Sequence, residues 1–83
     1  MARKKLISKE RFKVELGQRI RAIRLSKGIS QKQLEAMDDS FDKSYLSKIE
    51  RGKKIPSSYT LLKLAALLEE DISSFFYPKK TAE

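Results

Sequence analysis

The sequence predicts an all-α protein, a compact domain of five helices. Apolar residues recur every three or four positions in several segments, which is the period of an amphipathic helix. No segment alternates apolar and polar residues as a strand does, and four of the five expected helices follow a Ser or Asp that can cap them. A chain of 83 residues has room for one hydrophobic core.

The first helix is expected from about residue 10 to Lys27. Its apolar stripe consists of Phe12, Leu16, Ile20 and Ile23. Gly28 follows at a position where glycine commonly ends a helix. Gly17 lies inside the helix at a cost of about 1 kcal/mol relative to Ala, which indicates close packing against another helix.

Two short helices are expected next, separated by a polar turn at residues 38–41. Ser30 and Gln33 have the spacing of a capping box, so the second helix should begin at Gln31. Its inward residues should be Leu34 and Met37. Asp42 is the expected cap of a third helix, Lys43 to about Arg51, which Gly52 ends and whose inward residues are Leu46 and Ile49.

Two more helices complete the expected fold. Ser57 or Ser58 should cap the fourth, which is apolar nearly all round and is therefore expected to be the most buried. Asp71 should cap a short fifth helix, Ile72 to Phe76, closed by Tyr77 and Pro78. One ring of this segment, Phe76, is expected to cover the core, and another forms either a dimer contact or ordinary core packing.

The ends and the composition exclude several classes of protein. We expect a flexible basic arm at residues 1–9, a domain at 10–77 and a polar tail at 78–83. The absence of Cys and His removes disulfides, thiolate metal sites and the commonest general base, so we expect no cofactor, no metal and no enzyme activity. No apolar run approaches the roughly 20 residues of a membrane span, and no export signal is evident, so we expect a cytoplasmic protein.

Positive charge is concentrated in two segments. The net charge is +8; residues 1–27 hold ten basic against two acidic residues, and residues 43–54 hold five against one. A polyanionic partner such as nucleic acid explains this clustering, although a solubilising surface charge would also produce it.

Several independent motifs resemble the phage-repressor, or Cro-like (XRE), helix-turn-helix family. They are Arg-Ile-Arg-x-x-Arg in the first helix, Ser-Gln opening the second, SYLSKIERG in the third, and Pro-Ser before the Leu-rich fourth. The resemblance covers about residues 14–76 and implies a five-helix domain that binds duplex DNA sequence-specifically, usually as a dimer. There are two departures: the turn at 38–41 is one residue longer than usual and lacks the customary Gly, and Glu69 stands where many members have Gly.

The third helix is the expected base-reading element. Leu46 and Ile49 should face the core while a polar and basic stripe lies opposite, and short Ser side chains let a helix approach base edges. The resemblance implies that Lys43, Ser44 and Ser47 read bases, with Lys48 reading bases or binding phosphate. The alternative is an ordinary solvated helix face.

Further residues are expected to contact the DNA backbone. The resemblance places Gln31 on a phosphate, where a helix N-terminus already favours an anion, although Gln31 could be a plain helix former. The other expected backbone contacts are Arg24, Tyr45, Arg51, Lys53, Lys54, Tyr59 and Thr60. Tyr45 could instead form part of the core edge, and the loop lysines could simply be solvated. Arg24 and Glu50 are also expected to form a structural ion pair, and the basic residues of the arm either follow the DNA or are solvated.

These observations lead to one main functional hypothesis and one alternative. The main hypothesis is a transcription regulator that binds double-stranded DNA as a homodimer on a palindromic operator, of the repressor, restriction–modification controller or antitoxin type. A toxin or polymerase is a possible protein partner, and no membrane partner is expected. The alternative is a protein-interaction module that has this fold but does not read bases.

Overall fold

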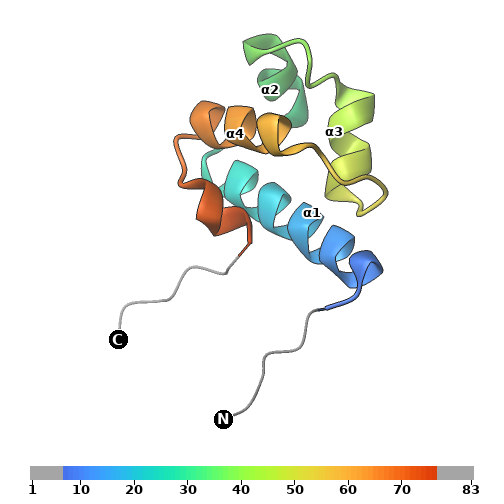
Figure 1. Ribbon diagram of the computed structural model, residues 1–83. Coiled ribbons are helices and arrows are strands. Elements are labelled where there is room, and N and C mark those ends of the chain that lie inside the picture. The colour runs from blue at the N-terminus through green and yellow to red at the C-terminus, as the bar shows by residue number, and fades with distance from the viewer. Residues whose placement is uncertain (1–6, 77–83) are drawn as a thin grey trace.

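The computed structural model describes residues 7–76, which form four α-helices and one 3-10 helix. They are α1 (Lys9–Ser26), α2 (Gln31–Met37), α3 (Lys43–Glu50), α4 (Ser58–Leu67) and η1 (Ile72–Phe75). In Figure 1, α3 lies beside α1 and α2, while η1 lies against α1 and α4. The all-α class is confirmed, and no strand occurs among these residues. The expected fifth α-helix is wrong, because only a four-residue 3-10 turn forms there.

Each helix begins where a Ser or Asp side chain can accept a backbone N–H. Ser30 and Gln33 form the expected capping box, with Ser30 N 2.7 Å from Gln33 Oε1 and Gln33 N 3.0 Å from Ser30 Oγ. Asp42 caps α3, and Ser57 rather than Ser58 caps α4. Lys9, which we placed in the N-terminal arm, lies in the first turn of α1 behind the cap Ser8. The rest of the expected arm, residues 1–6, and residues 77–83 at the other end lie outside the described part of the chain.

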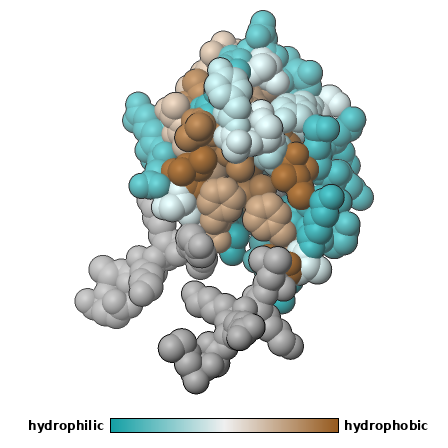
Figure 2. Space-filling model, in the orientation of Figure 1, coloured by the Kyte–Doolittle hydropathy of each residue, from teal (hydrophilic) through white to brown (hydrophobic). Residues whose placement is uncertain are grey.

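One hydrophobic core joins all five elements. It consists of Leu16, Ile20, Leu34, Phe41, Leu46, Ile49, Leu61, Leu64, Ala65, Leu68 and Phe75. The expected inward residues of α1 and α3 all lie in this core or pack against it. Figure 2 shows one face of the molecule, where the hydrophobic surface is gathered into a central area with hydrophilic residues on either side.

Two expectations about the core are wrong, those for Met37 and for α4, and one is incomplete. Met37 is 49% exposed, because α2 ends there and only one turn of this short helix reaches the interior. Phe76 packs against the core as expected and stacks on Phe12, but the fully buried ring of the C-terminal segment is Phe75. Leu62 is exposed, so α4 buries one face and is not enclosed on all sides.

Within the described residues, no helix is long and apolar enough to cross a membrane.

Helices α1 and α3 touch through their backbones at Gly17. A Cβ atom added at Gly17 would overlap the carbonyl oxygen of Ile49 and lie 2.8 Å from that of Glu50. The expectation of close packing at this glycine is therefore confirmed, and the partner is α3. Because the obstacle is backbone, it cannot move aside as a flexible side chain would.

We predict that Gly17→Ala destabilises the protein by about 1–3 kcal/mol, because the added methyl forces α1 away from α3. In an ordinary helix interior the same change would stabilise by about 1 kcal/mol, so the sign of the effect tests the contact. Urea unfolding of the variant measures it. The matched control is Gln18→Ala at the exposed neighbouring position, which should change the free energy of unfolding by less than about 0.5 kcal/mol.

Helices α1, α3 and α4 all end in the same hydrogen-bonded motif, which needs a left-handed residue just after the helix. After α4, Glu69 N lies 3.2 Å from Ala66 O and Glu70 N lies 2.9 Å from Ala65 O, the paired bonds of a Schellman motif. The left-handed residues after α1 and α3 are Gly28 (φ 73°) and Gly52 (φ 74°). After α4 that residue is Glu69, with φ 53°. Glu69, which stands where many family members have Gly, therefore adopts the left-handed backbone conformation that favours Gly.

We predict that Glu69→Gly stabilises the protein by about 1 kcal/mol, because a left-handed conformation costs an L-residue roughly 1–2 kcal/mol. Thermal and urea unfolding measure the gain. Glu69→Ala is the matched control: it removes the same carboxylate but keeps the Cβ, so it should give no comparable gain. Equal stabilisation by both variants would assign the effect to the charge.

Candidate nucleic-acid interface

Helix α3 divides into a buried and a solvent-facing side. Leu46, Ile49 and Glu50 are buried against α1 and α2. The outward side carries five of the residues expected on DNA. Four of them, Lys43, Ser44, Lys48 and Arg51, are exposed, and Ser47 is half-buried. The side chain of Asp42 caps the first turn by accepting from Tyr45 N at 2.8 Å. The expected polar and basic stripe therefore lies on one solvent-facing surface of α3.

A buried ion pair joins α1 to the end of α3. Arg24 Nε lies 2.7 Å from Glu50 Oε2, and Arg24 Nη2 lies 2.8 Å from Glu50 Oε1, so the contact is bidentate. Arg24 Nη1 donates to the carbonyl oxygen of Ile29 at 2.7 Å. The two side chains are only 5% and 2% exposed. The guanidinium is thus turned into the protein, and the structure does not present Arg24 to a phosphate.

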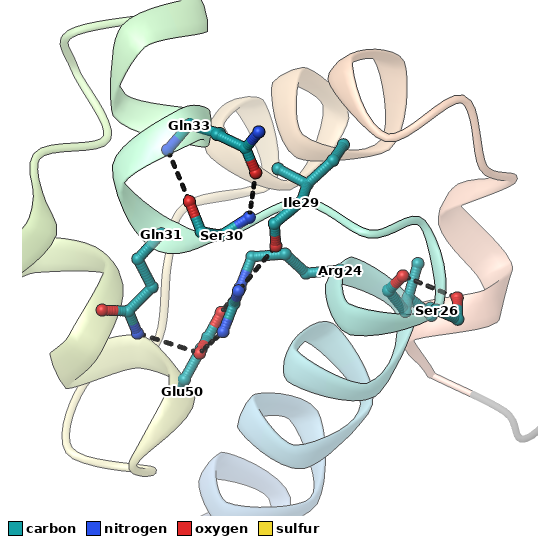
Figure 3. A network of polar contacts seen from close by, with 8 residues as sticks. Arg24, Ser26, Ile29, Ser30, Gln31, Gln33 and Glu50 are labelled. Atoms are coloured by element: carbon teal, nitrogen blue, oxygen red, sulfur yellow. Dashed lines mark hydrogen bonds and ion pairs between the residues drawn. The ribbon is translucent and has the colours of Figure 1, made fainter.

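Gln31 connects α2 to the same pair. Its Nε2 donates to Glu50 Oε1 at 3.0 Å, so one carboxylate holds residues from α1 and α2 at once (Figure 3). Gln31 is half-buried and lies in the first turn of α2, where backbone N–H groups favour an anion. In Figure 3 its side-chain oxygen points away from Glu50. The contact with Glu50 fixes the side chain that we expect to meet a phosphate.

The remaining expected backbone residues lie within α3, in the loop after it and at the start of α4. Lys53, Lys54 and Tyr59 are exposed, whereas Thr60 is half-buried and its Oγ1 accepts from Ser57 Oγ at 3.0 Å. Tyr45 is half-buried, since its ring packs against Phe41. The ammonium of Lys54 lies 6.0 Å from the centre of the Tyr45 ring. Tyr45 therefore belongs to the core edge and also borders the basic loop.

The turn between α2 and α3 is tied to α4 by contacts that the sequence did not indicate. Hydrogen bonds from the Ser40 side chain and backbone, with a further contribution from Lys63, lower the pKa of Asp38 to about 2. Lys63 Nζ lies 3.0 Å from Asp38 Oδ2, across 25 residues of chain. Lys63 was not among the expected site residues, because a single lysine on a helix has no pattern that reveals a distant partner.

The arrangement of these helices defines a class of protein. Two short helices, α2 and α3, are joined by a turn and backed by α1 and α4, and α3 presents polar and basic side chains to solvent. This arrangement is a helix-turn-helix unit.

Comparison with known proteins agrees with this class. A family model described as helix-turn-helix matches residues 20–75. The chain belongs to this family, in its XRE-type branch of DNA-binding transcription regulators. Among solved structures it is similar to "Crystal structure of the DNA-binding domain of BldD", with 23% identity and a TM-score of 0.75. That match covers 83% of this chain and 97% of the other, and supports the shared fold. The comparison with curated proteins gives no match.

We predict that Glu50→Ala destabilises the protein by about 3–5 kcal/mol, because it leaves the buried guanidinium of Arg24 without its counterion. The double variant Arg24→Met/Glu50→Leu should recover most of the loss, since it removes both charges and fills the same space. Urea unfolding of the two variants measures the difference. A double variant as unstable as Glu50→Ala would contradict the prediction.

Proposed function

We propose that this protein is a transcription regulator that binds double-stranded DNA sequence-specifically, with α3 in the major groove. The observation that carries the proposal is the outward side of α3, where exposed polar and basic residues stand on a helix whose other side is fixed in the core. A helix of this width fits the major groove, where each base pair presents a distinct pattern of donors and acceptors.

Base reading is assigned to the first two turns of α3. Lys43 and Ser44 extend from its exposed N-terminal turn, and Ser47 lies one turn further on. A lysine can donate to guanine O6 and N7, and serine can donate or accept. Lys48, which is exposed, is proposed to contact either a base or a phosphate.

Phosphate contacts are proposed for residues at the start of α2, on or after α3 and at the start of α4. They are Gln31, Tyr45, Arg51, Lys53, Lys54, Tyr59 and Thr60, all of which are exposed or half-buried. Contacts of this kind orient a protein on DNA without reading sequence. Arg24 is omitted from this set, because its burial and its bonds to Glu50 and Ile29 leave it a structural role.

The proposed working unit is a homodimer on a palindromic operator. A single α3 offers few reading residues, and two copies related by a two-fold axis would read half-sites about 34 Å apart, one turn of DNA. Occupancy of a promoter would then repress transcription. The palindromic operator, the formation of a dimer and the binding of any protein partner all belong to this proposal.

We predict that a selection from random duplex DNA yields a palindromic consensus, and that affinity for it falls by roughly three decades between 50 and 200 mM salt. That loss corresponds to about six neutralised phosphates. A protein-interaction module would show no such slope and no consensus.

We predict that Lys43→Ala and Lys53→Ala have different effects on this binding. Lys43→Ala should weaken the preference at one position of each half-site by about 1–3 kcal/mol. Lys53→Ala should weaken binding to all sequences and make the salt slope of the dimer shallower by about two, because each protomer then neutralises one phosphate fewer. Fluorescence anisotropy with consensus and scrambled duplexes measures both. If Lys43→Ala binds and discriminates as the wild type does, the assignment of α3 to base reading is wrong.

A further inference from the structure

The ammonium of Lys63, on α4, contacts the turn that precedes α3. Its Nζ donates to Ser40 Oγ at 2.8 Å and lies 3.0 Å from Asp38 Oδ2. The same nitrogen lies 5.5 Å from the centre of the Phe41 ring and 5.6 Å from that of Tyr59. One cation is thus held by a carboxylate, a hydroxyl and two aromatic rings.

The groups that hold Lys63 are themselves ordered by local bonds. Asp38 Oδ1 accepts from Ser40 N at 3.0 Å and from Ser40 Oγ at 2.7 Å, and Asp38 O accepts from Phe41 N at 3.0 Å. The Phe41 side chain is fully buried, and the next residue, Asp42, caps α3. An unbroken series of contacts therefore leads from Lys63 to the first turn of α3.

Stability alone does not account for this arrangement. The Lys63 and Asp38 side chains are 28% and 25% exposed, and ion pairs this close to solvent contribute little to the free energy of unfolding. The Lys63 contacts matter more for the geometry of the turn, because the turn joins two short helices: α2 has only 7 residues and α3 only 8. Helices this short are held in place by tertiary contacts, and the turn joins its contacts at the start of α3 to those that α1 makes with the rest of the helix.

We propose that Lys63 is a positioning residue for base reading, which fixes the turn at residues 38–41 and thereby the orientation of the first turn of α3. This turn has no glycine, and the Lys63 contact gives it a defined shape. The proposal rests on the proposed function, since Lys43 and Ser44 in that first turn are the assigned base readers.

The test uses Lys63→Met, which keeps an apolar stem of similar length and removes the cation. Lys63→Arg restores a cation at the same place. The matched control is Lys27→Met, because Lys27 forms a comparable pair with Glu70, Nζ to Oε2 at 3.5 Å, that joins α1 to the segment before η1. Lys27 makes no contact with the turn before α3 among those described.

The first measurement needs no DNA. Amide hydrogen exchange at Tyr45 and Leu46, whose N–H groups bond to Asp42, reports opening of the first turn of α3. We expect exchange there to rise about three- to five-fold in Lys63→Met relative to Lys27→Met, and to return towards wild type in Lys63→Arg. Equal protection in Lys63→Met and Lys27→Met would overturn the proposal.

The second measurement compares sequence preference at fixed salt. We expect Lys63→Met to lower the ratio of consensus to single-mismatch affinity by roughly five- to ten-fold at positions read from the start of α3, with Lys27→Met unchanged. A uniform loss at all sequences, or an unchanged ratio, would overturn the positioning role. If the wild type itself selects no consensus, the proposed function fails, and the exchange experiment alone decides whether Lys63 orders α3.

Ser40→Ala provides a second variant should Lys63→Met fold poorly. It removes the hydroxyl that Lys63 and Asp38 share while leaving both charges in place. A change of preference in the same direction as in Lys63→Met supports the proposal, and a wild-type preference with wild-type exchange contradicts it.

Discussion

The direct contact between α1 and α3 is the constraint on which the rest of the structure depends. At Gly17 the two backbones approach so closely that a methyl group would not fit, and further along α1 the buried Arg24–Glu50 pair joins the same helices. The glycine sets the separation of the helices and the ion pair sets their register. All buried polar side-chain atoms in the described residues have partners, so the charges are held without an unsatisfied group. Because this contact buries one side of α3, the opposite side is the one that faces solvent.

Glu50 shows how one side chain can hold three elements. It accepts from Arg24 on α1 and from Gln31 on α2 while belonging to α3 (Figure 3). Because Gln31 also stands at the N-terminus of α2, the residue expected at a phosphate is linked to the core. A polyanion bound there would meet a side chain already oriented, which reduces the entropy lost on binding.

The turn between α2 and α3 is better ordered than its sequence, without the family's customary Gly, suggests. An added residue without a glycine would ordinarily loosen the link between two short helices. Here Phe41 fills the core from within the turn, and Asp38 binds Ser40 and Lys63 around it. The turn is thus tied to α4, a helix outside the helix-turn-helix unit, by the contacts of Lys63 with Asp38 and Ser40.

The sequence by itself determined the class, the starts of α2 and α3 and the candidate reading surface, because the pattern of caps and of apolar residues is local to each helix. Capping by Ser30 and Asp42 and the polar stripe of α3 are local patterns of this kind. Only the tertiary structure decided which apolar residues are buried: Phe75 enters the core while Phe76 packs at its edge, since a 3-10 turn points its side chains differently from an α-helix. The partners of Gln31 and Lys63 were likewise beyond the sequence, because contacts across 19 and 23 residues depend on how the helices pack.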